Sequence, residues 1–525
     1  AHGDFVDGFA VVAHFGTRNP EDEEVARTDI IAVTGLPVTC GHDLSAALNG
    51  PKRALTAVLN ARLIGMIAGL IAAAESMLSA RGINAPLMLV RGDGSLVAGD
   101  FARARPIETI LSGPAASLVG AAHLTGLEDA VVSDIGGTTT DIGLLGQSRP
   151  SVAEDGASVG GHRTMVQAVD MSTHGLGGDS EVQVDDRVPE PCVMLGPRRV
   201  IPISLIAAEH ESVLAALERQ LGATAPRALD ARFLLPGPGR RSELKPAEIA
   251  LLEAIGDGPV AADRVLRSRA LIAALDRLVA RGVVRVAGFT PSDAAHVLGR
   301  QADWDAEAAA WAATLMARKR DATGRPVAAT PEEFAHLVHR TLIRHSAEAI
   351  LDAALARDGH PDPHPSRAPL ARAALDGHHG AARISIGLAY PLIGLGASAP
   401  VYYPEIAALL GTEVAVPAHS DVANAVGAVV GRVRITRTAT VTQPELGIFR
   451  AHLPDGTADF EDLDSARAGV MDALSELAAS EAREAGAAEV ELSFDWSHND
   501  ATVEGKPLFV EAHAAVTATG RPRLG

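Results

Sequence analysis

The chain has 525 residues, a formal net charge of −19 and 47% hydrophobic residues. This length exceeds one ordinary core and predicts two to four packed units, and the negative charge argues against nucleic acid as a main partner because phosphate binding needs a positive field. The two cysteines, Cys40 and Cys192, exclude a disulfide framework and fit a reducing compartment.

The cellular location is predicted to be cytoplasmic, without contact to a membrane. The most apolar stretch, ARLIGMIAGLIAAAESML, contains Arg62 and Glu75 and is expected to be an amphipathic helix too interrupted to span a bilayer. No secretory signal is visible at the start. The sequence begins at Ala1 and enters a domain-like pattern at once, so we expect a processed N-terminus or an absent leading segment.

Strands and helices are expected to alternate over residues 1–190, which predicts an α/β layer. The stretch 8–15 reads as a strand, and 19–33 as a helix with Asn19 as N-cap and Pro20 at its first position. Further expected elements are a strand at 36–40, a long helix at 52–81, a buried strand at 85–90, a helix at 115–124 and a hairpin at 131–145. The turn RGDGS at 91–95 ends a buried strand, where ligand contacts are common in open α/β sheets.

Residues 191–300 are expected to separate two α/β sections. The part 191–242 is rich in Pro, Gly and Arg and reads as an irregular linker. Three short helices and a hairpin-like run over 243–300 resemble a winged helix. That segment carries eight Lys/Arg and seven Asp/Glu without a basic recognition face, which favours a packing insertion over DNA binding.

The rest of the chain is expected to form two further parts. Helices and a second α/β section are predicted over 301–432, and a small α+β unit over 433–525. The predicted domains are therefore 1–190, 191–300, 301–432 and 433–525. Histidines of the proline-rich loop near 358–380 lack regular ligand spacing and are read as solvated.

The strongest chemical signal is VVSDIGGTTTDIGLL, residues 131–145. Two strand-like runs flank a Gly-Gly-Thr-Thr-Thr connection whose backbone can approach a ligand closely and form an anion-binding nest. Carboxylates beside a phosphate would repel it unless a divalent cation lies between them, and Mg²⁺ meets that need. Asp134 and Asp141 are therefore candidates for metal or water positioning and for acid–base chemistry. The alternative is an ordinary glycine hairpin with solvated aspartates.

Three other stretches are weaker signals. Gly394-x-Gly396 at a strand-to-helix turn would admit a nucleotide ring or ribose, or would serve close packing, and the two readings are even. The helix 421–431 has small residues four apart, which predicts close helix–helix contact between lobes. The glycine-rich loop 172–181, with His174 and Asp179, lines the same cleft or is a flexible turn. Cys40 and His42 are too near in sequence to favour a thiol nucleophile with its base.

Together, the motifs RPIETILSGPAASLVGAA, the hairpin, VDMSTHGLGGDS and IGLGASAP…VPAHSDVANAVGAVVG make the chain resemble the hydantoinase A/5-oxoprolinase family. That family belongs to the sugar-kinase/actin/Hsp70 superfamily of ATPases. The resemblance implies actin-like, ribonuclease H-like lobes with an inserted helical, winged-helix-like segment and a small C-terminal α+β unit. It matches 134–141 to the second phosphate loop, 393–398 to the adenosine loop and 421–431 to the second connecting helix.

The resemblance also implies ATP and Mg²⁺ as cofactors. It assigns catalytic roles to Asp134 and Asp141, a metal-binding role to Asp134, and nucleotide contacts to Gly136, Gly137, Thr138, Thr139, Thr140, Gly177, Gly178, Gly394, Gly396 and Ser398. The family opens with another hairpin of the form D-x-G-G-T-x-T-D, and this sequence contains only the copy at 134–141. The first loop is thus expected to be missing or supplied separately.

The implied activity is ATP-dependent opening of a cyclic amide such as a hydantoin, 5-oxoproline or another lactam. Phosphorylating the amide oxygen makes it a leaving group, so the protein mainly positions reactants and neutralises phosphate charge. A hydantoinase B-type partner subunit and an oligomer are expected. The alternatives are an ATP-activating subunit of an acetone- or acetophenone-type carboxylase, a non-catalytic nucleotide-binding regulator, or a degenerate scaffold.

Overall fold

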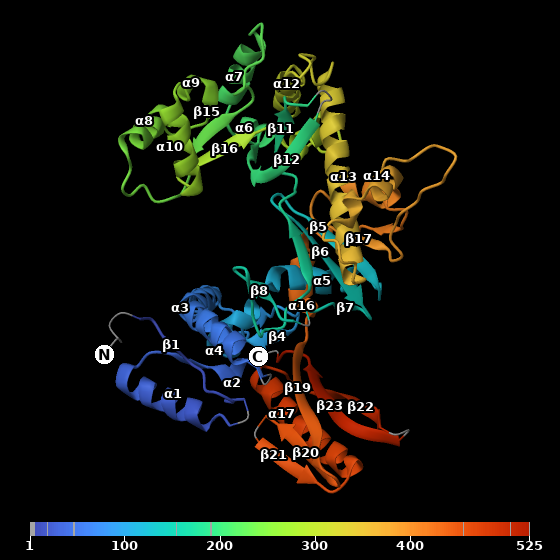
Figure 1. Ribbon diagram of the computed structural model, residues 1–525. Coiled ribbons are helices and arrows are strands. Elements are labelled where there is room, and N and C mark those ends of the chain that lie inside the picture. Colours follow the sequence, from blue (N-terminus) through green and yellow to red (C-terminus); the bar gives the residue numbers. More distant parts are fainter. Residues whose placement is uncertain are drawn as a thin grey trace. The chain divides into compact units, whose positions relative to one another are not determined.

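The computed structural model describes residues 6–17, 19–45, 48–153, 155–188, 192–454, 456–503 and 506–523. By contact the chain divides into two compact units (Figure 1). Unit 1 comprises 1–128, 145–170 and 422–525, and unit 2 comprises 129–144 and 171–421. The four-domain division expected from the sequence stays a prediction.

The N-terminal part of unit 1 pairs a short parallel sheet with helices. Strands β1 (Phe9–Val11) and β2 (Val38–Cys40) flank α1 (Glu21–Thr34), which begins with four acidic residues that favour the positive end of the helix dipole. The N-cap is Pro20 and not Asn19 as predicted, so the helix begins one residue later, and Asn19 Oδ1 accepts from the Glu21 amide at 3.0 Å just before it. Then follow α2 (Gly41–Leu44) and α3 (Gly50–Ala80).

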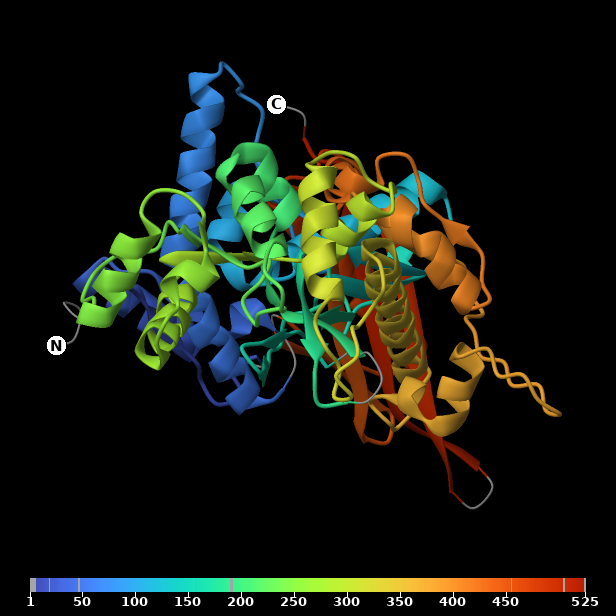
Figure 2. The same cartoon turned by 90° about the horizontal axis from the view of Figure 1, so that it is seen from above.

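Helix α3 is the long blue helix of Figure 2, and it differs from the expectation in one respect. By length and composition it is apolar enough to cross a membrane. Only 17% of its most apolar window is buried within this fold. The expectation that no such run exists is therefore wrong. The first half of the helix contains buried polar side chains whose hydrogen bonds are made inside the protein. Asn60, for example, donates to Thr39 Oγ1 at 3.0 Å and to the Ala104 carbonyl at 3.0 Å. The cytoplasmic location stays a prediction.

The described remainder of unit 1 contains helices and a seven-stranded, mostly antiparallel sheet that includes one short hairpin from the first hundred residues. Helices α4 (Gly99–Ala104) and α5 (Ser112–Thr125) follow the hairpin of β3 (Met88–Val90) and β4 (Leu96–Ala98). The C-terminal sheet has the order β21-β20-β19-β23-β22, and α17 (Leu463–Glu484) packs its apolar side on that sheet. The strands are β19 (Val433–Glu445), β20 (Ile448–Leu453), β21 (Gly456–Phe460), β22 (Glu491–Val503) and β23 (Lys506–Gly520), the last two forming a long hairpin (Figure 2).

Helices α5 and α16 (Ala423–Val430) approach each other very closely, as the small residues predicted, but both belong to unit 1, so the contact lies within one unit and not between two. A Cβ on Gly120 would lie 1.9 Å from the Ala423 carbonyl oxygen, and one on Gly427 would lie 1.9 Å from that of Ala116. Any side chain at either glycine would therefore force the helices apart.

Unit 2 is built around a mixed sheet with the order β10-β6-β5-β17-β18. Strands β5 (Ala130–Ile135), β6 (Thr140–Gly146) and β10 (Met171–His174) are antiparallel, whereas β17 (Leu392–Leu395) and β18 (Val414–Ala415) run parallel to β5. Helices α13 (Pro331–Arg357) and α15 (Ala399–Leu409) share a buried core with these strands, and Figure 1 shows α13 beside them. This is the ribonuclease H-like lobe that the resemblance implies.

The second half of unit 2 corrects two expectations. The predicted irregular linker 191–242 contains regular elements over its described residues 192–242, namely β12 (Cys192–Arg199), β13 (Ile201–Pro202), α6 (Ile203–Glu209), α7 (Ser212–Leu221) and β14 (Phe233–Pro236). The apolar run after the three helices is one strand, β16 (Val284–Gly288), and not a hairpin, because its antiparallel partner is β14 from before those helices.

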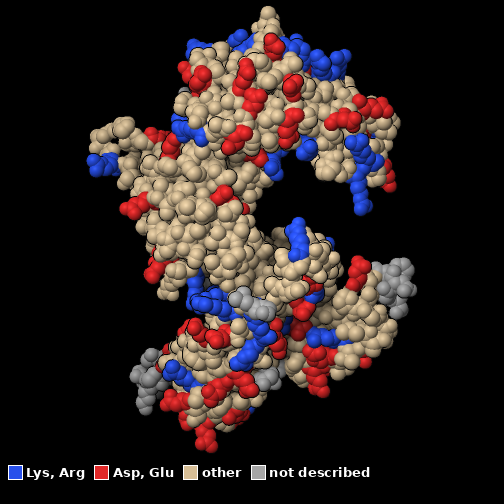
Figure 3. Space-filling view, turned by 180° about the vertical axis from the view of Figure 1, so that it is seen from behind, with Lys and Arg blue, Asp and Glu red and all other residues tan. Residues whose placement is uncertain are grey.

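The winged-helix-like segment is thus a small α+β layer. Helices α8 (Pro246–Ile255), α9 (Ala262–Val265) and α10 (Arg269–Ala280) pack on a sheet of order β13-β16-β14-β15, where β15 is Val260–Ala261. Helices α11 (Pro291–Val297) and α12 (Ala306–Ala317) follow. On the face drawn in Figure 3, basic and acidic side chains are interspersed.

Candidate functional site

The connection between β5 and β6 is a tight turn whose tip is open to solvent. The Gly136 amide donates to the Thr139 carbonyl at 2.9 Å and closes the turn. Gly136 and Thr138 are exposed, and Gly137 and Thr139 are half-buried. The tip of the turn is therefore accessible to solvent, and anion binding by these residues stays a prediction.

The glycine-rich loop 174–180 packs directly on this turn. The Gly178 amide donates to the Gly136 carbonyl at 3.0 Å, and the Asp179 amide donates to the Gly137 carbonyl at 2.8 Å. A Cβ on Gly177 would lie 2.6 Å from both of those carbonyl oxygens, so only glycine permits this approach. Of the two readings of this loop, the structure supports the one in which it accompanies the hairpin.

The threonine at the end of the turn joins these two segments. Thr140 is fully buried, and its Oγ1 donates to the Leu176 carbonyl at 2.7 Å. In this arrangement its hydroxyl holds the turn against the loop 174–180. Contact between Thr140 and a nucleotide stays a prediction.

Carboxylates surround the turn. Asp134 ends β5 and Asp141 begins β6, where it accepts a hydrogen bond from Thr173 Oγ1 at 2.6 Å. A third carboxylate, Asp179, lies close enough that a Cβ on Gly137 would be 2.5 Å from its Oδ2. Arg199 pairs with Asp179 at 2.9 Å. Oxygen ligands of this kind suit Mg²⁺, so the residues present fit the expected cation.

The predicted adenosine loop reaches the same place from about 250 residues further along the chain. In the register of β17 with β5, Gly394 lies opposite Ser133 and Leu395 opposite Asp134. Gly396 has a φ of +101°, and a Cβ there would lie 2.3 Å from the Ile135 carbonyl oxygen and 3.3 Å from Asp134 Oδ1. The close approach of Gly396 to the hairpin therefore requires glycine for two reasons.

Gly394 has a different reason to be glycine. A Cβ on it would lie 2.3 Å from the Tyr403 ring, so this residue is needed for packing of α15 on the sheet. Ser398 is half-buried at the N-terminus of α15. Both glycines are thus explained by close packing within the protein, Gly394 against Tyr403 and Gly396 against the hairpin, and contact of either glycine or Ser398 with a nucleotide stays a prediction.

Tyr403 is a site-supporting residue that sequence reasoning missed. Its buried hydroxyl donates to the Ser133 carbonyl and lies 3.0 Å from Ser133 Oγ. Burial raises the pKa of the Tyr403 phenol well above its usual value, and the charges of Asp134 and Asp141 add to that rise. The phenol therefore stays a hydrogen-bond donor and holds β5 in place. No local sequence signal marks this contact, because 270 residues separate the partners.

Loop 174–180 also contains a histidine with a perturbed environment. His174 Nε2 lies 2.8 Å from Ser172 Oγ. Burial lowers the pKa of His174 from its usual value, although the nearby carboxylates of Asp352 and Asp141 oppose this. The imidazole is therefore neutral near pH 7.

Comparison with known proteins bears on the segment that carries this site. The family model described as hydantoinase/oxoprolinase matches residues 53–198, which include the turn and the loop 174–180. This segment is similar to hydantoinase/oxoprolinase proteins. The predicted resemblance is confirmed by this match.

Two curated relatives share part of the sequence. The alpha subunit of caprolactamase from Pseudomonas jessenii is 27% identical over 185 residues, which is 34% of this chain and 26% of that protein. The gamma subunit of acetophenone carboxylase from Aromatoleum aromaticum is 28% identical over 160 residues, which is 29% of this chain and 21% of that protein. The chain thus matches about a quarter of the length of these relatives.

Two solved structures share the fold. The ATP-dependent caprolactamase from Pseudomonas jessenii aligns with a TM-score of 0.59 and 17% identity, over 99% of this chain and 65% of that one. A nucleotide-free acetone carboxylase aligns with a TM-score of 0.53 and 15% identity, over 98% of this chain and 64% of that one. At these identities the likeness establishes the fold.

Proposed function

We propose that this chain binds Mg-ATP and activates the carbonyl oxygen of a cyclic amide for ring opening. The observation that carries the proposal is the convergence of three segments in unit 2, namely the turn 136–139, the loop 176–180 and Gly396. Sequence matches to subunits of a caprolactamase and a carboxylase support an activity of this kind.

The proposed role of each residue in the site follows from its position. Gly137, Thr138 and Thr139 would hold phosphate oxygens through amides and hydroxyls, and Gly396 would allow the nucleoside to lie close to β5. Asp134 and Asp141 would hold the cation and orient the attacking group. Mg²⁺ supplies charge neutralisation between the phosphates and these carboxylates.

The reaction balances as a phosphoryl transfer followed by hydrolysis. The amide oxygen attacks the γ-phosphorus of ATP, and the bond to the bridging oxygen breaks to release ADP. A first water then adds to the activated carbon and the C–N bond breaks, with the nitrogen taking a proton, which leaves an acyl phosphate. A second water attacks the acyl carbon and releases phosphate with the former carbonyl oxygen, so ring opening consumes one ATP and two waters. An amide is a poor electrophile, so activation removes the main barrier, and positioning of the reactants supplies much of the rest.

A second candidate function has equal support from the comparisons: an ATP-activating subunit of a ketone carboxylase. The acetophenone carboxylase relative and the acetone carboxylase fold favour it. In both functions we propose a partner subunit, of hydantoinase B type for the lactamase, because the two curated relatives are named as subunits.

Calorimetric titration with Mg-ATP tests the nucleotide site. We expect binding by the unaltered chain, at least 100-fold weaker binding by Asp134→Ala, and unchanged binding by the control Asp303→Ala, which removes an exposed carboxylate of the same unit. No binding by the unaltered chain would refute an autonomous nucleotide site, and equal binding by Asp134→Ala would refute the role of Asp134.

Phosphate release separates the two activities. Release that depends on a hydantoin, 5-oxoproline or another lactam would support the amidohydrolase. Release that depends on bicarbonate together with acetone or acetophenone would establish the carboxylase role instead.

A further inference from the structure

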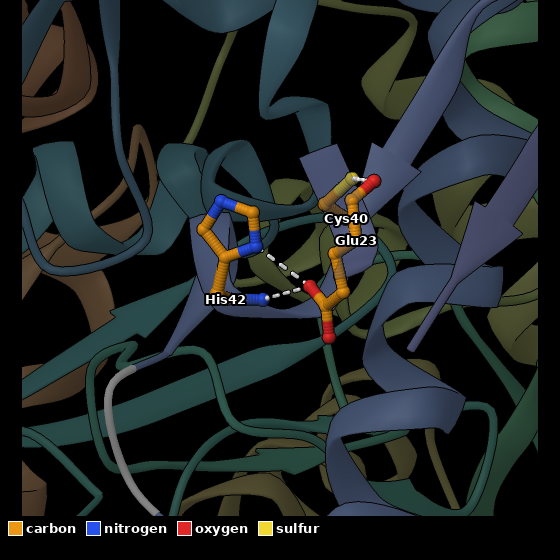
Figure 4. Close-up of side chains that lie close together, drawn as sticks. All are labelled: Glu23, Cys40 and His42. Atoms are coloured by element: carbon orange, nitrogen blue, oxygen red, sulfur yellow. Dashed lines mark hydrogen bonds and ion pairs between the residues drawn. The ribbon is translucent and has the colours of Figure 1, made fainter. Parts of the chain in front are cut away.

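A second group of chemically reactive side chains lies in unit 1, outside the nucleotide site. Glu23 comes from α1, Cys40 ends β2, and His42 lies in α2 (Figure 4). One ligand atom from each of the three lies within 4.8 Å of the others. Glu23 and Cys40 are fully buried, and the His42 side chain is 18% exposed. A carboxylate, a thiol and an imidazole therefore meet at one partly accessible point.

The imidazole of His42 lies between carboxylates. Its Nδ1 is 2.6 Å from Glu23 Oε2, which also accepts the His42 amide at 2.9 Å. On the opposite side of the ring, Nε2 is 3.0 Å from Glu24 Oε1 and 3.4 Å from Asp43 Oδ1. The Cys40 thiol donates to the Glu23 carbonyl at 3.4 Å. Figure 4 shows the Glu23 side chain directed toward His42.

A thiol nucleophile with His42 as its base is a poor explanation of this group. Both ring nitrogens of His42 are engaged by carboxylates, and the sulfur is fully buried. Burial raises the pKa of the Cys40 thiol to about 11, and the nearby Arg27 guanidinium only partly offsets this. Reactive cysteines are accessible and have lowered pKa values, so Cys40 in this state is inert.

We propose that Glu23, Cys40 and His42 bind a zinc ion that fastens α1 to β2. Thiolate, imidazole and carboxylate are the three ligand types that zinc takes in proteins. The ion would replace two protons. One is the proton between Nδ1 of His42 and Oε2 of Glu23, and the other is the proton of the Cys40 thiol. Water completes the four ligands.

The hydrogen bond on the far side of the His42 ring is of the kind that zinc-bound histidines make. A histidine bound through one ring nitrogen commonly donates its other N–H to a carboxylate, which fixes the tautomer and the ring plane. With Nδ1 on the metal, the Nε2–H of His42 donates to Glu24 at the observed 3.0 Å. This bond already exists, so the ring needs no reorientation to become a ligand.

Tetrahedral coordination of zinc by these three side chains requires small movements of the ligand atoms. Zn–S bonds of about 2.3 Å and Zn–N and Zn–O bonds of about 2.1 Å place tetrahedral ligand atoms about 3.3–3.7 Å apart. Glu23 Oε2 and His42 Nδ1 would separate by less than about 1 Å from their present contact. The Glu23 carboxylate is fixed, so the shift falls on the His42 ring, and the half-exposed Glu24 side chain beyond the ring would move with it. Gly16 is part of that fixation, since a Cβ there would lie 2.2 Å from Glu23 Oε1.

The local charge favours a cation. Carboxylates of Glu23, Glu24 and Asp43 lie around the His42 ring. The Arg27 guanidinium pairs with Asp43 and with Glu24, and the buried Arg53 donates to the Ala13 carbonyl at 2.9 Å. Glu23 is therefore compensated chiefly by hydrogen bonds from His42 and Ala13, and an ion at this point would neutralise it directly.

Cobalt titration of the full chain tests the site, because Co²⁺ bound to a thiolate gives a near-ultraviolet charge-transfer band. We expect one Co²⁺ per chain with this band, displaced by one equivalent of Zn²⁺. Cys40→Ser should abolish the band and weaken binding at least 100-fold, and His42→Gln should weaken it to a similar degree. The matched control Cys192→Ser, which removes the other cysteine of the chain, should leave both unchanged.

A titration of the unaltered chain without the band would overturn the proposal, as would equal affinity in Cys40→Ser. If Cys40→Ser is unfolded by circular dichroism, His42→Gln and the unaltered chain decide the question. Mg-ATP is omitted from the titration, and Asp134→Ala should bind Co²⁺ normally, so the result is independent of the proposed nucleotide site.

Discussion

Two hairpin turns of this chain look alike in sequence and differ in what surrounds them. RGDGS at 91–95 and DIGGTTTD at 134–141 both place glycine and aspartate between two antiparallel strands. In the first turn, Asp93 is only 8% exposed and its carboxylate accepts from the Ser95 amide at 3.0 Å, the Ser95 hydroxyl at 2.6 Å and Arg434 at 3.3 Å. The protein itself satisfies that aspartate.

The second turn presents its tip to solvent and receives other segments of backbone instead. Gly136 and Thr138 are exposed, and the loop 176–180 and Gly396 close on the turn from either side. A carboxylate beside glycine therefore indicates a ligand site only where the surrounding fold leaves the turn accessible. The position at the end of a strand, which suggested ligand contacts for 91–95, is explained there by internal structure.

The largest expected effect on Mg-ATP binding comes from a side chain placed between the loop 174–180 and the turn 136–139. Gly177→Val places a side chain where even a Cβ lies 2.6 Å from two carbonyl oxygens, so the loop must move away from the hairpin. Mg-ATP binding should weaken at least 100-fold in calorimetric titration. The control Gly258→Val, at a glycine with no atom within 4 Å of an added Cβ, should bind normally. Normal binding by Gly177→Val would show that the loop is not part of the site.

The opposite result is expected for the turn at 91–95. Asp93→Asn removes the buried carboxylate that pairs with Arg434 and lies beside Arg91, although Arg91 keeps Glu108 as a partner at 2.9 Å. The free energy of unfolding should fall by about 3 kcal/mol, measured by urea denaturation. Mg-ATP affinity should stay within about twofold. Loss of nucleotide binding in a folded Asp93→Asn protein would break the distinction between the two turns.

The pH dependence of the Asp93 effect has a defined sign. Burial alone raises the pKa of Asp93, but Arg91, Arg434 and Ser95 outweigh it and hold the pKa below its usual value. A depressed carboxyl pKa contributes stability above the unfolded pKa of about 3.9, and this is lost as pH falls through the folded value. The stability difference between the unaltered chain and Asp93→Asn should be constant from pH 5 to 7 and narrow below about pH 4. A gap that widens in acid would contradict the assignment.

A smaller effect is expected for the tyrosine behind the second turn. Tyr403→Phe removes a buried hydroxyl that bonds to Ser133, which should cost about 1–1.5 kcal/mol of stability. Nucleotide affinity should change by less than about threefold because the ring still fills the space beside Gly394. A thermal shift shows the first effect and titration the second; a large loss of affinity would mean that the hydroxyl positions β5 for binding.

The smallest effect on stability is expected for Arg199→Gln. This arginine is largely exposed, so loss of its pair with Asp179 should change stability by less than about 1 kcal/mol. Binding of Mg-ATP should weaken by up to about tenfold, since Asp179 would add uncompensated negative charge beside Gly137. Tighter binding would instead indicate that Asp179 serves as a cation ligand once it is released.

The sequence by itself determined the local elements and the character of the hairpin. Periodicity and capping residues located α1, α3 and α5 to within a few residues, because these signals are local. The glycine–threonine turn between apolar runs was predicted for the same reason. The irregular reading of 191–242 and the hairpin at 283–290 failed because β14 pairs with a strand that lies about 50 residues later.

Only the tertiary structure decided which of these features meet. The parallel pairing of β17 with β5 brings Gly396 to Asp134, and the packing of α15 explains Gly394 by Tyr403. The enclosure of Asp93 and the meeting of Glu23, Cys40 and His42 likewise depend on contacts between separate elements. Composition and spacing carry no record of such distant contacts, since burial and pairing arise from how the elements pack.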